Sequence, residues 1–265
     1  MTIQMDWDYT GRNVFVAGGS SGINLGLATA FGLRGAKVTI VSRSAERVAA
    51  AVQGMQAQRI EAWGYSADVR DPALIGAALE QAAAAMGPID VLISGAAGNF
   101  IAPALGMSTN GFKTVVDIDL NGTFNVLRQA HQHLRKPGAS VINISAPQAY
   151  NPVMYQAHVC AAKAGVDMLT RVLAMEWGTD GVRVNSIVPG PIADTEGIRR
   201  LAPTPEALQA MEQSVPLGRM GSTQDVADLA LFLASAQASY ITGTIIPVDG
   251  GSSLHGGRKL SYEPQ

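Results

Sequence analysis

The chain has 265 residues, 47% of them hydrophobic and 15% charged, which predicts one well-buried globular domain over residues 1–265, since no Pro/Gly/Ser-rich linker divides it. Its formal net charge of −2 excludes the strongly basic surfaces that bind nucleic acid or anionic membranes, so we expect a small-molecule partner. A single cysteine, Cys160, and the lack of an apolar run of about 18 residues exclude a disulfide framework, a multi-cysteine metal site and a membrane-spanning helix, and predict a cytoplasmic protein.

Strands and helices alternate along the whole chain. In chain order we expect a strand over 13–16, a helix over 25–33, a strand over 37–41, a helix over 45–58, a strand over 60–65, a helix over 72–86, a strand over 89–94, a helix over 112–134, a strand over 140–145, a helix over 154–177, a strand over 182–188, a helical insertion near 192–215, a helix over 223–235 and a strand over 244–248. This alternation predicts a doubly wound α/β fold, a Rossmann domain whose parallel sheet of about seven strands has helices on both faces. Ligands of such folds bind at the carboxyl ends of the strands. We expect residues 256–265 to form a mobile tail.

The turn after the first strand is rich in glycine and opens a helix. Glycines let the backbone turn tightly, and the helix start offers unpaired N–H groups and the positive end of its dipole to an anion. An ordinary strand-to-helix turn also uses glycine for packing, but the repeated strand–helix context favours a dinucleotide pyrophosphate. The residues expected to contact the cofactor here are Gly18, Ser20, Ser21, Gly22, Ile23 and Asn24.

The end of the second strand predicts which dinucleotide binds. In this fold a carboxylate at that place selects NAD, and a basic side chain selects NADP. The sequence has Arg43 there, whose guanidinium suits a 2′-phosphate, so we expect NADP(H); the alternative is a solvated arginine at a helix start. Asp68 and Val69 end the third strand, where a carboxylate can accept from the adenine amino group, and Ala96 belongs to a run of small residues after the fourth strand.

Six motifs in register resemble those of the short-chain dehydrogenase/reductase family over nearly the whole chain. They are the glycine turn, Asp68, the small residues at 94–98, Lys163, Pro189-Gly190, and residues 248–251. The resemblance implies that Lys163 bonds the nicotinamide ribose, that a homotetramer forms through the two long helices, and that the nicotinamide is lined by Pro189, Gly190, Ile192 and Thr195. Asn24 stands where the family usually has its third glycine. Since Asn can cap a helix, we expect an adjusted loop that still binds the cofactor.

One helix position departs from the carbonyl-reducing members of the family. Those members place a tyrosine one turn before the lysine, where it moves the substrate proton. In this sequence that residue is Val159. Tyr155, two turns before Lys163, and Tyr150, in the preceding loop, are the alternative phenols for a carbonyl/alcohol oxidoreductase. A further alternative is a catalytically idle NADP-binding protein.

A carboxyl group stands at another functional position of the family. Asp119 aligns with the asparagine that usually holds a proton-relay water. A buried carboxyl group with a raised pKa can pass a proton through water to an enolate. The alternative is a structural aspartate that bonds backbone groups.

A branch of the family that reduces without the tyrosine is the 2,4-dienoyl-CoA reductases, and the chain is similar to their peroxisomal type. The matching segments are 96–100, 112–115, 117–119, 122–126, 162–164, 176–178, 184–186, 189–192 and 195–201, with Pro103 and His158. The resemblance implies that a hydride reaches the distal end of a conjugated dienoyl thioester and that a water protonates the α carbon of the resulting dienolate. The implied catalytic residues are Lys163, Asp119, Asn121 and Ser145, and we expect no metal.

The same resemblance implies an acyl-CoA substrate. Arginines suit the phosphates of CoA and a phenylalanine suits its acyl chain, although each such residue alone is commonly a solvated arginine or a core phenylalanine. The implied contacts are Arg43, Arg70, Phe100, Ser108, Thr109, Asn110 and Arg200. We expect His158 to be structural. Residues 1–9 do not resemble a signal peptide and residues 262–265 are not a peroxisomal address, which agrees with the cytoplasm.

Overall fold

The computed structural model describes residues 7–254 and contains one seven-stranded parallel sheet. The strand order is β3-β2-β1-β4-β5-β6-β7, with β1 Asn13–Ala17, β2 Lys37–Ser42, β3 Ala62–Ser66, β4 Val91–Ser94, β5 Ser140–Ile144, β6 Arg183–Pro189 and β7 Ile245–Val248. The order reverses between β1 and β4, which confirms the doubly wound α/β fold that the alternation predicts. The tail expected at 256–265 lies outside the described residues.

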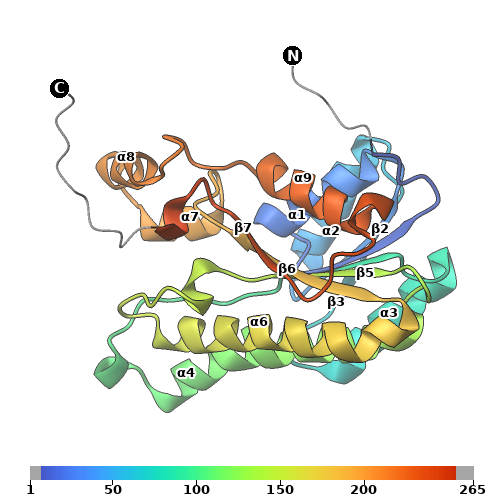
Figure 1. Ribbon diagram of the computed structural model, residues 1–265, viewed down its shortest axis with the longest axis horizontal. Helices are drawn as coiled ribbons and strands as arrows, with labels where there is room; N and C mark the ends of the chain where they lie inside the picture. The colour runs from blue at the N-terminus through green and yellow to red at the C-terminus, as the bar shows by residue number, and fades with distance from the viewer. Residues whose placement is uncertain (1–6, 255–265) are drawn as a thin grey trace.

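Helices cover both faces of the sheet, as Figure 1 shows. One layer holds α1 Gly22–Gly32, α2 Ala45–Ala57 and α9 Thr223–Ala234, and the other holds α3 Pro72–Met86, α4 Thr109–Val116, α5 Gly122–Ala130 and α6 Ala157–Trp177. Alternate residues of β1 enter the two cores, since Val14 and Val16 pack in one and Phe15 and Ala17 in the other. Burial on both faces explains why the strands are continuous apolar runs. Within residues 7–254, no helix is long and apolar enough to cross a membrane.

The helix expected over 112–134 follows the helical course of the chain but is not one regular α-helix, and it begins earlier, at Thr109. A π-helical segment, Asp117–Asn121, separates α4 from α5, and α5 ends at Ala130. The wider π turn carries Ile118 and Asp119 into the interior, where both are buried. Apolar spacing cannot reveal such a segment, because the residues on either side continue the helical pattern.

The helix expected from residue 154 begins three residues later, at Ala157. Tyr155 has a φ of 66°, a left-handed conformation that a right-handed helix cannot contain. The predicted insertion forms two helices, α7 Glu196–Leu201 and α8 Pro205–Ser214. Each begins behind a threonine, Thr195 or Thr204, whose hydroxyl caps it.

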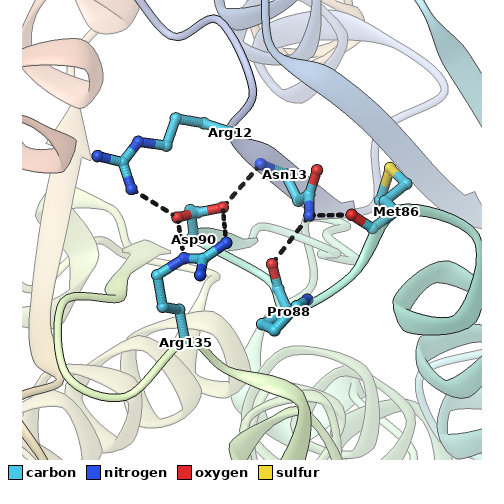
Figure 2. Close-up of polar contacts among 6 residues, drawn as sticks. All are labelled: Arg12, Asn13, Met86, Pro88, Asp90 and Arg135. Atoms are coloured by element: carbon cyan, nitrogen blue, oxygen red, sulfur yellow. Dashed lines mark hydrogen bonds and ion pairs between the residues drawn. The ribbon is translucent and has the colours of Figure 1, made fainter.

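At the amino-terminal ends of the strands, the side chain of Asp90 bonds residues from two other segments (Figure 2). Its buried carboxylate accepts the backbone N–H of Asn13 at 2.9 Å and pairs with Arg12 at 2.9 Å and with Arg135 at 2.5 Å. The Asn13 side chain in turn donates to the carbonyl of Met86. The cluster joins the starts of β1, β4 and β5, at the opposite end of the strands from their carboxyl ends.

Candidate active site

A cleft of about 490 Å³ opens at the carboxyl ends of the strands. Its walls are the turns after β1, β2, β3 and β4, together with part of α7. The strand order reverses here, and a crevice at such a point is where doubly wound sheets bind dinucleotides. Of the residues predicted to bind the cofactor, those that line the cleft are Gly18, Ser20, Ser21, Asn24, Arg43, Asp68, Val69 and Ala96.

The turn from β1 into α1 has the backbone conformation that its glycines allow. Gly18 and Gly22 have φ values of 81° and 57°. A Cβ at Gly18 would lie 2.8 Å from the nitrogen of Ala96, so glycine alone lets the turns after β1 and β4 approach this closely. Ser21 precedes α1 without a side-chain cap, which leaves the first N–H groups of the helix for an anion. These residues fit a pyrophosphate.

Asn24 lies inside α1 and does not cap it, which corrects the expected reason for its tolerance. Its amide nitrogen donates to the carbonyl of Gly95 at 2.8 Å and to that of Gly18 at 3.4 Å. A Cβ at Gly95 would fall 2.2 Å from the Asn24 Oδ1 atom, so the larger side chain fits only because Gly95 is opposite. Asn24 therefore links the two turns that form the floor of the cleft.

Two arginines stand at the end of the cleft beside β2. Arg43 follows the strand, as predicted, and Arg47 lies in the first turn of α2; both are exposed and both line the cleft. The sequence interpretation missed Arg47, and the available signal was its place in the first turn of the helix that Arg43 precedes. Two guanidinium groups here suit a phosphate better than a hydroxyl group.

Asp68 and Arg70, which are expected to contact different ligands, bind each other. Arg70 Nη2 lies 2.6 Å from Asp68 Oδ2, and Arg70 Nε lies 3.1 Å from Asp68 Oδ1. The hydrogen bonds from Arg70 hold the pKa of Asp68 below its usual range. Arg70 is thus already paired at the edge of the cofactor cleft, and it would have to leave Asp68 to grip a CoA phosphate.

A buried ion pair lies beside the carboxyl end of β5. Lys163 Nζ donates to the carbonyl of Ile144 at 2.9 Å and lies 3.6 Å from Asp119 Oδ2. Asp119 Oδ1 accepts the N–H of Gly98 at 2.7 Å. The side chains of Lys163 and Asp119 are 7% and 1% exposed. Burial raises the pKa of Asp119, and the positive charge of Lys163 opposes this shift without cancelling it. A raised pKa is what a carboxyl proton donor needs.

Within residues 7–254, the contacts of this pair include neither candidate tyrosine. Val159, one helical turn before Lys163, is 3% exposed. Tyr155 and Tyr150 lie outside α6, and their side chains are 52% and 46% exposed. The backbone of Tyr155 accepts the N–H of Ala102 at 3.0 Å, which fixes the loop before the helix. A buried aliphatic side chain therefore occupies the position of the usual tyrosine.

Of the two other predicted catalytic residues, Asn121 is exposed and Ser145 is buried. Asn121 is exposed, and its amide donates to Asp117 Oδ1 at 2.9 Å on the outer side of the π segment. Its predicted contact with the substrate oxygen does not fit this geometry, because a residue two positions from Asp119 faces away from it. Ser145 is buried and follows Ile144 directly, so it does lie at the same end of β5.

The segment after β6 packs closely against the loop after β7. Pro189 ends β6, and a Cβ at Gly190 would lie 2.5 Å from the Asp249 Cα atom, so glycine is required there. Ile192 is buried. The Thr195 hydroxyl donates to the carbonyl of Ile192 at 2.8 Å and accepts the N–H that caps α7. Thr195 thus shapes this segment, and its hydroxyl is already bonded within the protein.

A second hollow, of about 470 Å³, continues from the cofactor cleft. It shares residues 97–99 and Arg200 with the cleft, and it extends along Phe100, Ile101 and Leu201. Arg200 donates to the carbonyl of Asn99 at 3.5 Å and pairs with Glu196. Apolar walls beside a paired arginine suit an acyl chain attached to a phosphorylated carrier. We call this hollow the acyl groove.

The turn at 108–110 lies next to Phe100. Ser108 caps α4 by accepting the N–H of Gly111 at 3.0 Å. A Cβ at Gly111 would lie 3.2 Å from the ring of Phe100. Phe100, Arg200 and the 108–110 turn, all predicted to contact the substrate, are therefore brought to one region.

A hollow of about 790 Å³, larger than the cleft, lies at the amino-terminal ends of the strands, around Arg12, Asp90 and Arg135. Arg12 and Arg135 are already paired with Asp90, and parallel sheets bind ligands at the carboxyl ends of their strands. We assign the chemistry to the cleft and the acyl groove. Within residues 7–254, no group of three or more His, Cys, Asp or Glu side chains is arranged to hold a metal ion.

Comparisons with known proteins agree with this geometry. A family model described as enoyl-(acyl carrier protein) reductase matches residues 17–253. The peroxisomal (3E)-enoyl-CoA-producing 2,4-dienoyl-CoA reductase of Rattus norvegicus is 44% identical over 255 residues, which cover 94% of this chain and 87% of that protein. A probable (2E)-enoyl-CoA-producing 2,4-dienoyl-CoA reductase of Bacillus subtilis is 39% identical over 247 residues, 92% of this chain and 97% of that protein. The crystal structure of a short-chain dehydrogenase from Bacillus anthracis matches with a TM-score of 0.83 and 38% identity, over 94% of this chain and 99% of that one.

Proposed function

Because the chain belongs to the short-chain dehydrogenase/reductase family, we propose that it reduces conjugated 2,4-dienoyl thioesters of coenzyme A, with NADPH as the hydride donor. The observation that carries this proposal is the buried Val159 beside the Asp119–Lys163 pair. A ketone becomes an alkoxide and needs a proton at oxygen, which a phenol supplies. A dienoyl thioester becomes a dienolate and needs a proton at carbon, which a water can supply.

The cofactor-binding residues proposed here follow the cleft. The N–H groups at the start of α1, with Ser20 and Ser21, would hold the pyrophosphate, and Arg43 and Arg47 would hold the 2′-phosphate. Lys163 would bond the nicotinamide ribose. When bound, the nicotinamide supplies a hydride. Asp68, Val69, Ala96 and the segment from Pro189 to Thr195 would complete the walls around the adenine and the nicotinamide.

The proton would come from Asp119. Its pKa is raised by burial, and its Oδ2 atom accepts no hydrogen bond from the described residues. A water on Oδ2 could carry the proton to the α carbon of the dienolate, while the positive charge of Lys163 stabilises the carboxylate that forms when Asp119 gives up its proton. Protonation at the α carbon gives a 3-enoyl product, and protonation at the γ carbon gives a 2-enoyl product. We propose the 3-enoyl product, as named for the relative from Rattus norvegicus.

The acyl groove would take the substrate. Phe100 would contact the acyl chain or pantetheine, and Arg200 with the 108–110 turn would contact the polar part of CoA. Arg43 stands where it could serve both nucleotides, whereas Arg70 would first have to leave Asp68.

We propose further that the protein is a cytoplasmic homotetramer with one domain. An exposed apolar row on α6 supports the assembly, since Met168, Val172 and Met175 are 57%, 41% and 82% exposed and lie at helical spacing on one face. Light scattering on the purified protein measures the number of subunits directly, and a monomer at micromolar concentration would contradict the proposed tetramer.

Steady-state oxidation of NADPH tests the proposed activity. We expect turnover with 2,4-hexadienoyl-CoA, little turnover with simple ketones, and a 3-enoyl product by NMR. Turnover with ketones alone would favour a carbonyl reductase that uses Tyr155 or Tyr150. Tight NADPH binding without turnover of either substrate would favour an idle binding protein.

A further inference from the structure

His158 lies in the first turn of α6, directly before Val159. Its side chain is fully buried, and neither ring nitrogen has a hydrogen-bond partner within the described residues. Buried polar atoms are almost always paired, because an unpaired one loses its hydration without compensation. A histidine with two unpaired nitrogens in the active-site helix is therefore not explained by packing alone.

The surroundings of the ring connect it to both parts of the site. The ring centroid lies 4.3 Å from that of Phe100, which lines the acyl groove. Burial lowers the pKa of His158, and the nearby Asp119 carboxyl group and the backbone of Phe100 oppose this shift without reversing it. A neutral imidazole has one N–H donor and one acceptor nitrogen. His158 therefore brings an N–H group that has no partner within hydrogen-bond geometry, with the Phe100 backbone as its nearby acceptor, next to the proposed substrate wall and the proposed proton source.

Other donors near this point are committed or have another role. The N–H of Gly98 donates to Asp119, and one N–H of Lys163 donates to the carbonyl of Ile144. Lys163 keeps two further N–H groups, which the proposed function gives to the nicotinamide ribose. The Ser145 hydroxyl also has no partner among the described residues, and it lies at the end of β5.

We propose that His158 donates a hydrogen bond to the thioester carbonyl oxygen of the bound dienoyl-CoA, and so replaces the donor that is missing at Val159. This inference rests on the proposed function and adds a catalytic residue to it. The thioester would lie where Gly98, whose N–H donates to Asp119, lines the acyl groove, with its acyl chain against Phe100.

In the proposed reaction His158 donates a hydrogen bond and keeps its proton throughout. A hydride forms a C–H bond at the δ carbon, the two C=C bonds shift by one position, and the carbonyl π electrons move to the thioester oxygen. The N–H of His158 stabilises this oxyanion. A proton from Asp119 then forms a C–H bond at the α carbon through water, the C=O bond is restored, and solvent reprotonates Asp119. Removal of one preorganised oxyanion donor typically lowers kcat by about 10²–10³.

Three substitutions at this position test the role. His158→Phe keeps an aromatic ring against Phe100 but has no N–H group, so we expect kcat with 2,4-hexadienoyl-CoA to fall about 100-fold with unchanged NADPH affinity. His158→Gln and His158→Asn put an amide near the positions of Nε2 and Nδ1, and we expect one of them to recover about tenfold of the loss. His133→Phe, in the segment His131–His133 after α5, is the matched control and should leave kcat unchanged. A His158→Phe variant that binds NADPH normally and keeps kcat within about threefold of the wild type would overturn the proposal, as would recovery by neither amide.

A spectrum of the wild-type protein gives a readout that does not depend on any variant. In a dead-end complex with NADP⁺ and 2,4-hexadienoyl-CoA, a hydrogen bond to the carbonyl polarises the conjugated system and moves its absorption band to longer wavelength. We expect this shift in the wild type and a smaller one in His158→Phe. An unshifted band in a wild-type enzyme that turns over the substrate would overturn the role of His158 and leave the proposed function standing. A wild-type enzyme without dienoyl-CoA turnover would overturn both.

Discussion

Replacing Asp119 with asparagine tests the proton source directly. Asparagine has nearly the same shape, and its Oδ1 atom can still accept the N–H of Gly98, which lies 2.7 Å from the carboxylate. It has no acidic proton to give. General acids contribute about 10²–10⁴ to a rate, and a factor of 100 is about 2.7 kcal/mol of barrier. Since an asparagine can still hold a water, we expect the lower end, a fall in kcat of about 100-fold.

The assay is NADPH oxidation with 2,4-hexadienoyl-CoA over a pH series. A general acid acts in its protonated form, and burial raises the pKa of Asp119, so wild-type kcat should fall as the pH rises through that raised pKa. This fall should be missing in Asp119→Asn. Asp117→Asn is the matched control: the same change two residues away, at a side chain that pairs with Lys113 on the outer surface. The Asp117→Asn variant should keep kcat within about twofold of the wild-type value, because an exposed ion pair contributes little to the stability of the structure around it. Wild-type kcat and the same pH dependence in Asp119→Asn would refute the assignment.

Three further substitutions separate the parts of the molecule. Tyr155→Phe should keep kcat within about twofold, because the side chain is 52% exposed; a large loss in the NADPH assay would favour carbonyl chemistry. Arg43→Ala should raise the KM for NADPH by about 10- to 100-fold, the value of one or two charged hydrogen bonds, and leave the KM for NADH almost unchanged. An equal effect on both cofactors would place Arg43 away from the 2′-phosphate. Asp90→Asn should lower the free energy of unfolding by about 3 kcal/mol, the low end for a broken buried ion pair, because Arg12 and Arg135 are partly exposed. Urea unfolding measures this, and a loss below about 1 kcal/mol would make the cluster an ordinary surface pair.

The sequence predicts the fold well because the fold depends on patterns that are local. Each β-branched run followed by a helical run is one strand–helix unit, and such units assemble into a parallel sheet in few ways. The errors fall where one residue breaks a pattern that its neighbours continue. The π segment around Asp119 and the left-handed Tyr155 both interrupt helices that apolar spacing extends through them.

The site is harder to predict, because its residues choose partners across the fold. The glycine turn and the place of Lys163 follow from spacing. Arg70 pairs with Asp68, and Asn121 turns to Asp117; in both cases a neighbour supplies an opposite charge or an acceptor that a motif does not represent. Likewise, the lack of a hydrogen-bond partner within bonding geometry for either ring nitrogen of His158 follows from the three-dimensional structure and not from a sequence motif.

The hydrogen bonds of Asn24 have a consequence for how the protein meets its cofactor. Because one side chain bridges the carbonyls of Gly18 and Gly95, the floor of the cleft is cross-linked before a ligand arrives. Less conformational entropy is then lost on binding, and more of the contact energy appears as affinity. The residue that replaces a glycine thus gives rigidity to a loop that glycine alone would leave loose, and amide hydrogens around this turn should exchange slowly even in the free protein.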